Sequence, residues 1–368
     1  MIKRVLWGVL ALIIIAGVWA GFEVYRVSGL GTKLETKLAG ECVRVDVAPG
    51  AEDIQYDPET GLAFISAENR RVVDHNNPAP GMGTADGNGI YIVDVNVPLD
   101  QIGQATRVSP EGWRDFRPHG LYLWTGEDEA GTAAKRLFVV NHKSMARENI
   151  EQNVEIFNVG EGGMLTHLES ISFPEMFSPN DVVAVGPRQF YASNDIVNQE
   201  GIALYAEALL SLPLSSAVFF DGEKGRTVAE GLAFGNGINV SPDGQTVYIA
   251  EWTDHEVSFY DRLEDNSLSH RASYSMPAGV DNIDVGPDGT IWFGGLSRLF
   301  DFIESRDNPA KTVDSIGVKV DPQTGAYEVV FQAFKGEINS ASIAAVAGDK
   351  LLIGSVNDPF VLACPKPD

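Results

Sequence analysis

The stretch Ser178-Pro179-Asn180-Asp181-Val182-Val183-Ala184-Val185-Gly186-Pro187 places an Asn-Asp pair directly before a β-branched run that stops at Gly-Pro. β-Branched residues favour strands, and Gly and Pro favour turns. The same arrangement recurs at three other points of the chain: Glu52-Asp53, Asn236-Gly237 and Asp281-Asn282. Side chains that carry carboxylate or amide oxygens therefore stand at the head of several short strands.

Short alternating runs bounded by Gly, Pro, Asp and Asn dominate the chain from Gly40 onward, and helical periodicity is almost absent. Each unit contains a polar head, a short strand, a turn, a strong aromatic strand and two further strands. Such four-stranded units are typical of β-propeller blades. The heads, one for each unit, are Glu52, His119, Asn180, Asn236, Asn282 and Asn339. The sequence therefore predicts an all-β, six-bladed β-propeller, with a β-sandwich as the alternative and one short helix within 200–211.

An apolar segment at the N-terminus bears on location. Lys3 and Arg4 precede an uncharged run from Val5 to Phe22, which is close to the lower limit of about 17–25 residues for a membrane-spanning helix. Basic residues before such a run predict that the rest of the chain crosses the membrane. We favour an uncleaved signal anchor at 1–25, followed by a linker at 26–39 and the propeller at 40–368. The alternative is a cleaved signal peptide and a secreted protein. Both interpretations place the propeller outside the cytoplasm, in the periplasm or the extracellular space.

The charge of the chain and its cysteine content indicate which binding partners and which cellular compartment to expect. The chain has 51 acidic and 27 basic residues and a formal net charge of −24. Nucleic-acid binding needs clustered Lys and Arg, so we expect no nucleic-acid partner. Cys42 and Cys364 lie near opposite ends of the propeller segment. Either they form a bridge that closes the ring, or they are two buried thiols. The oligomeric state is not indicated.

The polar heads predict a metal site. The innermost strand of each propeller blade lines the central channel, so heads that are far apart in sequence converge at one mouth. Ca²⁺ takes about six to eight oxygen ligands, whereas zinc prefers His and Cys. Turn capping is the alternative role for any single Asn. The converging oxygen ligands are Glu52, Asn180, Asn236, Asp281 and Asn282.

Two histidines are expected at the same mouth. His119 stands at the second head, and His142 follows the next strand of that unit. Paired imidazoles beside a cation can act as a general base for water, and a structural role is the alternative. The chain has no Ser in a Gly-x-Ser-x-Gly context, so a covalent serine mechanism is not expected. The remaining histidines are interpreted as surface residues: His75, His167, His255 and His270.

The motifs and their order resemble the paraoxonase/arylesterase family from about Cys42 to Cys364. The matching segments include Pro118-His119-Gly120, the opening stretch from Asn180, and Val280-Asp281-Asn282-Ile283. The resemblance implies a six-bladed propeller with two Ca²⁺ ions that hydrolyses lactones and aryl esters, with organophosphates as substrates of some members.

By position, the resemblance also assigns roles to individual residues. Glu52, Asn180, Asn236, Asp281 and Asn282 match the ligands of a catalytic calcium. Asp53, Asp181 and the backbone carbonyl of Leu121 match those of a structural calcium. His119 and His142 match a catalytic His dyad, and Cys42 and Cys364 match a disulfide. In the mechanism that this implies, the upper Ca²⁺ polarises the ester carbonyl while His119, aided by His142, activates water.

Two departures from the family pattern concern substrate choice. Gly295-Leu296 stands where relatives often carry a further histidine, and Glu68-Asn69-Arg70-Arg71 is unusually charged for an active-site loop. Arg70 and Arg71 are able to contact an acidic substrate group, but a solvated loop face is the favoured interpretation. Two rival functions stay open: a gluconolactonase-type sugar-lactone hydrolase with one metal, and a non-catalytic, membrane-tethered binding propeller. The native lactone or ester is not indicated.

Overall fold

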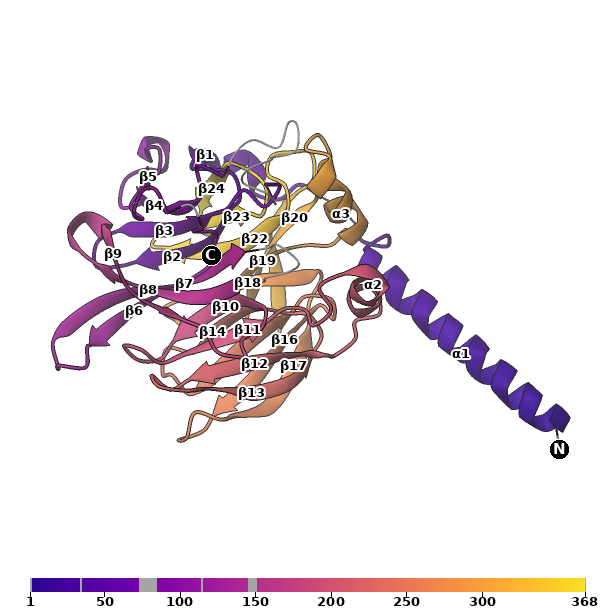
Figure 1. The fold of residues 1–368 in the computed structure, drawn as a ribbon. Helices are drawn as coiled ribbons and strands as arrows, with labels where there is room; N and C mark the ends of the chain where they lie inside the picture. Colours follow the sequence, from indigo (N-terminus) through magenta and orange to yellow (C-terminus); the bar gives the residue numbers. More distant parts are fainter. Residues whose placement is uncertain (1, 34, 73–84, 114, 145–150, 368) are drawn as a thin grey trace.

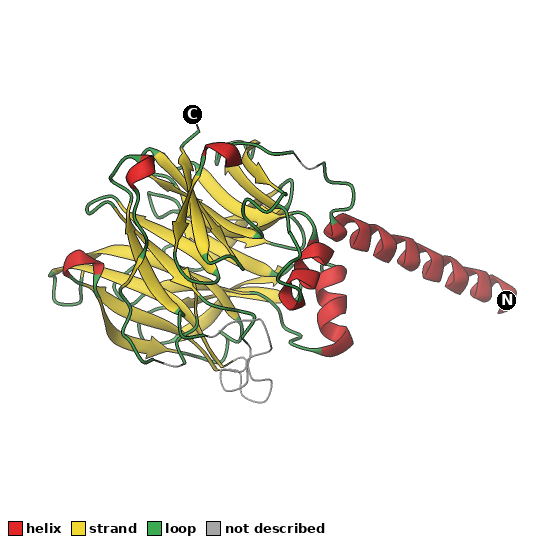
Figure 2. Ribbon diagram, turned by 90° about the horizontal axis from the view of Figure 1, so that it is seen from above, coloured by secondary structure: helices red, strands yellow, loops and turns green. Residues whose placement is uncertain are grey.

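The computed structural model describes residues 2–33, 35–72, 85–113, 115–144 and 151–367. Within these ranges the strands form six four-stranded sheets, which surround a common centre (Figure 1, Figure 2). The innermost strand of each sheet contacts the innermost strands of the two neighbouring sheets, and β22 of the last sheet contacts β2 of the first. The predicted six-bladed propeller is therefore confirmed, and the β-sandwich alternative is wrong.

The first three blades take their strands in chain order, from the centre outward. Blade 1 contains β2 (Ala51–Asp57), β3 (Leu62–Ala67), β4 (Gly89–Asp94) and β5 (Thr106–Arg107). Blade 2 contains β6 (Pro118–Glu127), β7 (Ala133–Ser144), β8 (Glu151–Val159) and β9 (Leu165–Ile171). Blade 3 contains β10 (Pro179–Ala184), β11 (Phe190–Asn194), β12 (Ser215–Phe220) and β13 (Gly225–Leu232).

The last blade differs from the other five because it joins the two ends of the chain. Blade 4 contains β14 (Gly235–Val240), β15 (Thr246–Glu251), β16 (Glu256–Arg262) and β17 (Leu268–Ser275). Blade 5 contains β18 (Gly279–Val285), β19 (Ile291–Leu296), β20 (Ser315–Val320) and β21 (Tyr327–Ala333). Blade 6 contains β22 (Ala341–Ala347), β23 (Lys350–Ser355), β24 (Phe360–Pro365) and, outermost, β1 (Val43–Asp46).

A disulfide fastens the strand pair that closes the ring. β1 pairs antiparallel with β24, with Val43 opposite Ala363. Cys42 and Cys364 are bonded at the edge of this pair across a sequence separation of 322. Such a link stabilises a fold by about 2–5 kcal/mol, mainly by restricting the unfolded chain. The closing bridge is confirmed, and the interpretation as two free thiols is wrong.

Three α-helices of the described part of the chain lie on one side of the propeller, and the longest projects away from it (Figure 1, Figure 2). They are α1 (Ile2–Ser28), α2 (Gly201–Leu209) and α3 (Leu299–Asp307), and three short 3₁₀ turns span Ala39–Glu41, Leu99–Gln101 and Glu161–Gly163. By length and composition α1 is apolar enough to cross a membrane, with a mean hydropathy of 2.4. The helix expected within 200–211 is confirmed as α2. α3 was not predicted, because its charged and aromatic residues alternate without a clear helical period.

The last turn of α1 is attached to the propeller. Arg26 Nη1 donates to the carbonyl oxygen of Thr253 at 2.9 Å, and Arg26 Nη2 donates to Asp254 Oδ1 at 2.9 Å and to Ser211 Oγ at 2.8 Å. Val27 is buried directly after it. The helix therefore leaves the propeller from a fixed position beside α2 and α3, both of which it contacts.

Every innermost strand has a bulge near its start, where two of its residues stand opposite one residue of the second strand and the register shifts by one residue. A bulge bends a strand and redirects its side chains. The bulged pairs are Glu52–Asp53, His119–Gly120, Asn180–Asp181, Asn236–Gly237, Asp281–Asn282 and Ser342–Ile343. The predicted sixth head is wrong: Asn339 precedes β22, and its Oδ1 accepts a hydrogen bond from Val313 N–H at 3.2 Å.

Acidic side chains near these bulges also join neighbouring blades. In three places a carboxylate oxygen on one innermost strand accepts a backbone hydrogen bond from the innermost strand of the next blade. The donors and acceptors are Leu121 N–H to Asp53 Oδ2 at 2.7 Å, Ile238 N–H to Asp181 Oδ2 at 2.8 Å, and Val346 N–H to Asp284 Oδ2 at 2.8 Å. Acidic residues near the strand heads therefore link the innermost strands of neighbouring blades by hydrogen bonds, close to one mouth of the central channel.

Candidate active site

A cavity of about 260 Å³ lies over the ring of bulges. Its floor is lined by one residue from each of five bulges: Glu52, His119, Asn180, Asn236 and Asp281. His142 from β7 completes this floor, and Asn282 is buried beside Asp281 in the same bulge. The structure thus brings together side chains from five blades that the sequence analysis singled out.

The floor is rich in oxygen atoms that lack partners. Three buried amide oxygens, Asn180 Oδ1, Asn236 Oδ1 and Asn282 Oδ1, accept no hydrogen bond from any described residue. Buried polar groups normally have partners, so each such oxygen calls for an explanation. Burial raises the pKa values of the Glu52 and Asp281 carboxyls; Arg70 opposes the shift at Glu52, while Glu52 adds to the one at Asp281. Four blades thus contribute hard oxygen donors to one place, and too few positive charges lie nearby to balance them. This arrangement fits a divalent ion such as calcium.

Asp53 and Asp181 form a second pair of buried carboxyl groups, at the next position of their bulges. Burial raises the pKa of Asp53 to about 8; the Leu121 hydrogen bond opposes this shift and the Glu52 charge adds to it. Burial and the charge of Asp53 raise the pKa of Asp181. Two carboxylates that repel each other in a buried place fit a second cation. Leu121 lies beside Asp53, to which its N–H donates a hydrogen bond. The role of its carbonyl oxygen as a metal ligand stays a prediction.

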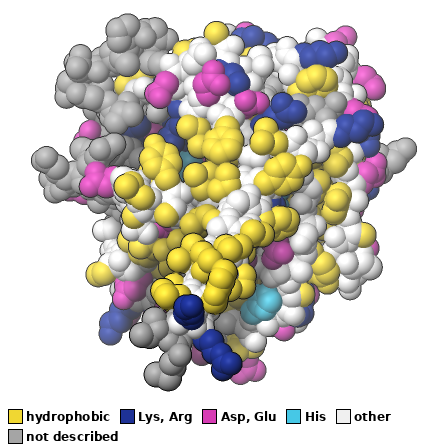
Figure 3. Space-filling view, turned by 90° about the vertical axis from the view of Figure 1, so that its right-hand side faces the viewer, with side chains coloured by type: hydrophobic (Ala, Val, Ile, Leu, Met, Phe, Trp, Pro, Cys, Tyr) yellow, Lys and Arg dark blue, Asp and Glu magenta, His cyan; other side chains and the backbone are white. Residues whose placement is uncertain are grey.

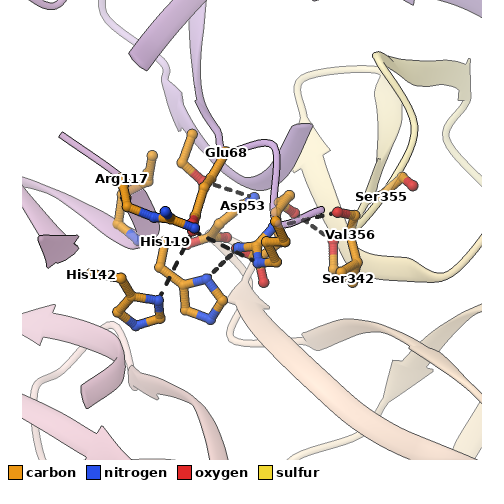
Figure 4. A network of polar contacts seen from close by, with 12 residues as sticks. Asp53, Glu68, Arg117, His119, His142, Ser342, Ser355 and Val356 are labelled. Atoms are coloured by element: carbon orange, nitrogen blue, oxygen red, sulfur yellow. Dashed lines mark hydrogen bonds and ion pairs between the residues drawn. The ribbon is translucent and has the colours of Figure 1, made fainter. Parts of the chain in front are cut away.

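His119 and His142 lie side by side, with ring centroids 4.4 Å apart (Figure 4). His142 Nε2 lies 2.9 Å from the carbonyl oxygen of Pro179; since a carbonyl only accepts, Nε2 carries the proton. His119 Nδ1 lies 3.1 Å from Glu52 Oε2 and also contacts the guanidinium of Arg70, which only donates. Burial, followed by the Arg70 charge, lowers the pKa of His119 well below its usual value. Both effects disfavour a charged imidazolium at His119, and the guanidinium contact favours a lone pair at Nδ1.

The loop after β3 enters the cavity, so the solvated loop face favoured from the sequence is wrong. Glu68 is buried, and the side chain of Arg70 is 12 % exposed. Glu68 Oε1 accepts a hydrogen bond from Arg117 Nε at 2.7 Å, while Glu68 Oε2 lies 3.9 Å from His142 Nδ1. One atom each from Glu68, His119 and His142 lies within 4.8 Å of the other two. This carboxylate–imidazole cluster can hold a proton and balance its charge.

Comparison with known proteins identifies the family. A family model named Arylesterase matches residues 37–364. The chain belongs to the arylesterase family. Among curated relatives, serum paraoxonase/arylesterase 1 of Homo sapiens is 33% identical over 325 residues, and serum paraoxonase/arylesterase 2 of Gallus gallus is 32% identical over 323 residues. Each alignment covers 84% of this arylesterase and 84% of the relative. The resemblance to the family is confirmed, and so is the enzyme class, an esterase-type hydrolase.

Solved propellers share the fold of this arylesterase at low sequence identity. A putative gluconolactonase aligns with a TM-score of 0.51 and 14% identity over 89% of this chain and 92% of its own. A luciferin-regenerating enzyme aligns with a TM-score of 0.54 and 12% identity over 91% and 96%. At such low identity the likeness supports the propeller fold alone.

Most of the cavity residues that follow the second strands of the blades were not selected as site residues from the sequence. They share one place in the fold, at or just after the end of the second strand of a blade, and comprise Glu68, His142, Asp195, Trp252, Leu296 and Val356. Because the first two strands of a blade are antiparallel, the second ends where the first begins. Asp195 accepts hydrogen bonds from Ser178 Oγ and Ile196 N–H, and burial raises its pKa. Of these residues, only His142 was recognised from the sequence by its place after the second strand of its blade.

The histidines of the arylesterase outside the cavity have different surroundings. His167 and His270 are exposed, as expected. His255 is half-buried, and burial together with the nearby Arg26 lowers its pKa to about 4, so its interpretation as a surface residue is wrong. His75 lies outside the described residues.

Proposed function

We propose that this arylesterase hydrolyses lactones and aryl esters with Ca²⁺ as its cofactor. The observation that carries the proposal is the shared floor of the cavity, where unpartnered amide oxygens and buried carboxyls lie beside two neighbouring imidazoles. Family membership supports the ester and lactone class, and the donor chemistry supports calcium. A propeller that only binds a partner has no use for a neutral imidazole base beside such a group of donors.

The residues present would hold two cations. Glu52, Asn180, Asn236, Asp281 and Asn282 would hold one at the floor, and Asp53, Asp181 and the Leu121 carbonyl would hold the other. When bound, the cation at the floor supplies Lewis-acid polarisation of an ester carbonyl.

The imidazoles supply the base. His119 takes a proton from water at Nδ1, and the water oxygen forms the new bond to the acyl carbon while the bond to the leaving alcohol breaks. The proton then passes to the leaving oxygen, which yields one acid and one alcohol. His142 is fixed by its hydrogen bond to Pro179, so that its Nδ1 faces Glu68 at 3.9 Å. Glu68 balances the positive charge that the His pair carries during the reaction.

Metal removal and one substitution test the proposal together. Exhaustive chelation should abolish hydrolysis of phenyl acetate and of a δ-lactone and lower the melting temperature, and added Ca²⁺ should restore both. His119→Gln should reduce kcat by on the order of 10²–10⁴, whereas the exposed His270→Gln should not change it. Full activity after chelation would refute the metal role, and an unchanged rate in His119→Gln would refute the base.

A metal count separates this proposal from the gluconolactonase-type alternative. Elemental analysis of the purified protein should find two calcium ions per chain. One ion, together with a preference for sugar lactones over aryl esters, would favour the alternative. No turnover of any lactone or ester in a broad panel, with metal bound, would favour a binding propeller.

We also propose that α1 anchors the propeller to a membrane on its extracytoplasmic side. Apolar side chains occupy the middle of the face from which α1 projects (Figure 3). Exposed apolar residues beside α1 include Leu30, Ile202, Tyr205, Leu214 and Phe300, which would lie against the lipid surface. After membrane isolation the full chain should resist extraction by alkaline carbonate, and its N-terminal sequence should begin before Val5. Recovery of a chain that begins after Ala20 in the soluble fraction would show a cleaved signal peptide instead.

A further inference from the structure

Positive charge gathers in the cavity of a strongly acidic protein. The chain has a formal net charge of −24, yet four arginines line the cavity within the described part of the chain: Arg70, Arg71, Arg117 and Arg306. Of these, Arg117 is neutralised by Glu68 through a hydrogen bond of 2.7 Å. The other three differ in how fully their charge is balanced.

Arg306 and Arg71 carry the least balanced charge. Arg306, on the last turn of α3, makes no hydrogen bond or ion pair with the described residues. Desolvation within the cavity, followed by the Arg70 charge, lowers the pKa of Arg306. Arg71 Nε and Nη2 donate to the carbonyl oxygen of Ser305 at 3.3 and 3.1 Å, and no carboxylate is paired with Arg71 among the described residues. Arg71 therefore fastens the loop after β3 to the end of α3 and holds its own charge beside Arg306.

Arg70 joins this group when the metal site is filled. In the structure its guanidinium contacts Glu52 and His119, and Nη1 donates to the carbonyl oxygen of Val356 at 3.4 Å. A divalent cation on Glu52 and Asp281 would neutralise both carboxylates. Arg70 would then keep Glu68, 3.9 Å away, as its carboxylate partner among the described residues, and Arg117 already shares that carboxylate. Asp195 would then be the one acidic side chain among the described lining residues without an arginine or cation partner.

Part of the cavity wall is apolar. Phe234 and Trp252 have ring centroids 5.3 Å apart, Trp252 and Phe302 lie 6.0 Å apart, and Leu296 packs in the same cluster. A ligand that fills the cavity thus meets oxygen donors and imidazoles at the floor, and aromatic rings and guanidinium groups along the wall.

We propose that Arg306, Arg71 and Arg70 form an anion subsite that selects lactones and esters carrying a second, negatively charged group, a carboxylate or a phosphate, remote from the scissile bond. The inference rests on the proposed hydrolase function of the same cavity. Guanidinium groups present paired N–H donors that match both kinds of oxyanion, and they remain charged when partly desolvated. The apolar part of the wall contacts the hydrocarbon between the two ends of the substrate.

A pair of matched esters tests the selectivity. 4-Nitrophenyl valerate and the mono-4-nitrophenyl ester of glutaric acid have the same chain length, but a carboxylate replaces the terminal methyl group. The wild-type protein should have the higher kcat/KM for the anionic ester. Arg306→Gln should lower the ratio of the two kcat/KM values about tenfold or more, and Arg306→Glu should lower it further. Arg271→Gln is the control, since Arg271 pairs with Asp261 on blade 4 away from the cavity, and should leave the ratio unchanged. An equal ratio in wild type and both Arg306 variants would overturn the proposal.

A binding measurement tests the subsite without turnover. Phenylacetate and phenyl phosphate, titrated calorimetrically into the calcium-loaded protein, should both bind, and Arg306→Gln should weaken both. Tighter binding of one of them identifies the preferred anion, and binding should weaken after chelation because Glu52 then competes for Arg70. If Arg306→Gln loses anion binding but the wild-type protein turns over neither ester, the subsite is supported and the hydrolase function is refuted. Turnover of the valerate ester without anion preference or anion binding would refute the subsite and leave the hydrolase standing. Thermal unfolding of each variant shows that the fold is kept.

Discussion

Glu68 Oε2 lies 3.9 Å from Nδ1 of His142 and accepts no hydrogen bond from the described residues. The other carboxylate oxygen is held by Arg117, and the opposite nitrogen of His142 is held by Pro179. Both groups are therefore fixed with their free atoms facing each other. In the mechanism proposed above, Glu68 would act through His142 as a positioning residue and would stabilise the imidazolium formed when the His pair takes a proton.

Glu68→Gln should lower kcat by about 10–100-fold and change KM little, because a charge at this distance in a partly desolvated site is worth a few kcal/mol to the protonated imidazole. Glu68→Asp should restore part of the rate. Glu129→Gln removes a carboxylate that pairs with Arg136 at an exposed site, and it should have no effect. If kcat falls only in proportion to a loss of folded protein, Glu68 merely compensates the charge of Arg117.

The heads of the strands could be predicted because each combines local signals that do not depend on tertiary contacts. An oxygen-bearing side chain, a β-branched run and a Gly- or Pro-containing turn together locate four of the bulges, and His119 located the fifth. The sixth was misplaced because Ser342 carries neither a carboxylate nor an amide group. Asn339, three residues earlier, does carry an amide group and was therefore taken as the head. The bulge itself, which turns these side chains into one cavity, depends on the pairing with the next strand.

The rest of the cavity could not be predicted from local patterns. Glu68 and Asp195 are acidic whereas Trp252 is aromatic, and their shared place at the end of a second strand appears only when the antiparallel pairing is known. The loop Glu68-Asn69-Arg70-Arg71 looks solvated by composition alone. It is buried because Arg117, Glu52 and the end of α3 supply partners from distant parts of the chain.

The closing disulfide should contribute measurably to stability. Replacing Cys42 and Cys364 together by Ala should lower the free energy of unfolding by about 2–5 kcal/mol, because the unfolded chain loses its longest cross-link. Reductant should lower the melting temperature of the wild type to about that of the double variant. Since the chain has two cysteines, reductant should not affect the double variant. A wild type that melts identically with and without reductant would show that β1 and β24 hold the ring closed unaided.

His255 should make stability depend on pH. Burial, followed by the nearby Arg26, lowers its pKa to about 4, whereas in the unfolded chain it is about 6.5. The folded state thus resists protonation, so the contribution of neutral His255 is complete above about pH 6.5 and is lost progressively as the pH falls toward 4.

Between pH 7 and pH 5 the melting temperature of the wild type should therefore fall more than that of His255→Asn. Asn is chosen because the backbone φ at this position is 56°, a conformation that Asn tolerates better than most residues. His270→Asn, at an exposed position, should follow the wild type. Parallel curves for wild type and His255→Asn would place the pH dependence elsewhere, such as in the buried carboxyls at the floor.

Gly237, next to the proposed metal ligand Asn236, lies where blades 4 and 5 approach each other closely. A Cβ atom there would lie 2.5 Å from the carbonyl oxygen of Asp281 and 2.6 Å from the backbone nitrogen of Ile283. Both are backbone atoms of the neighbouring innermost strand, so no side chain can turn aside to make room. Gly237→Ala must separate the two strands and should destabilise the fold by about 1–3 kcal/mol.

The same separation moves Asn236 away from Asp281, so the variant should also bind Ca²⁺ more weakly, which a calorimetric titration of the chelated protein measures. Gly103→Ala is the control, because no atom lies within 4 Å of a Cβ at that position, and it should change neither property. A variant that loses stability but keeps full calcium affinity would show that the oxygen donors move independently of the strand that carries them. In that case the packing between blades 4 and 5 would not set the geometry of the site.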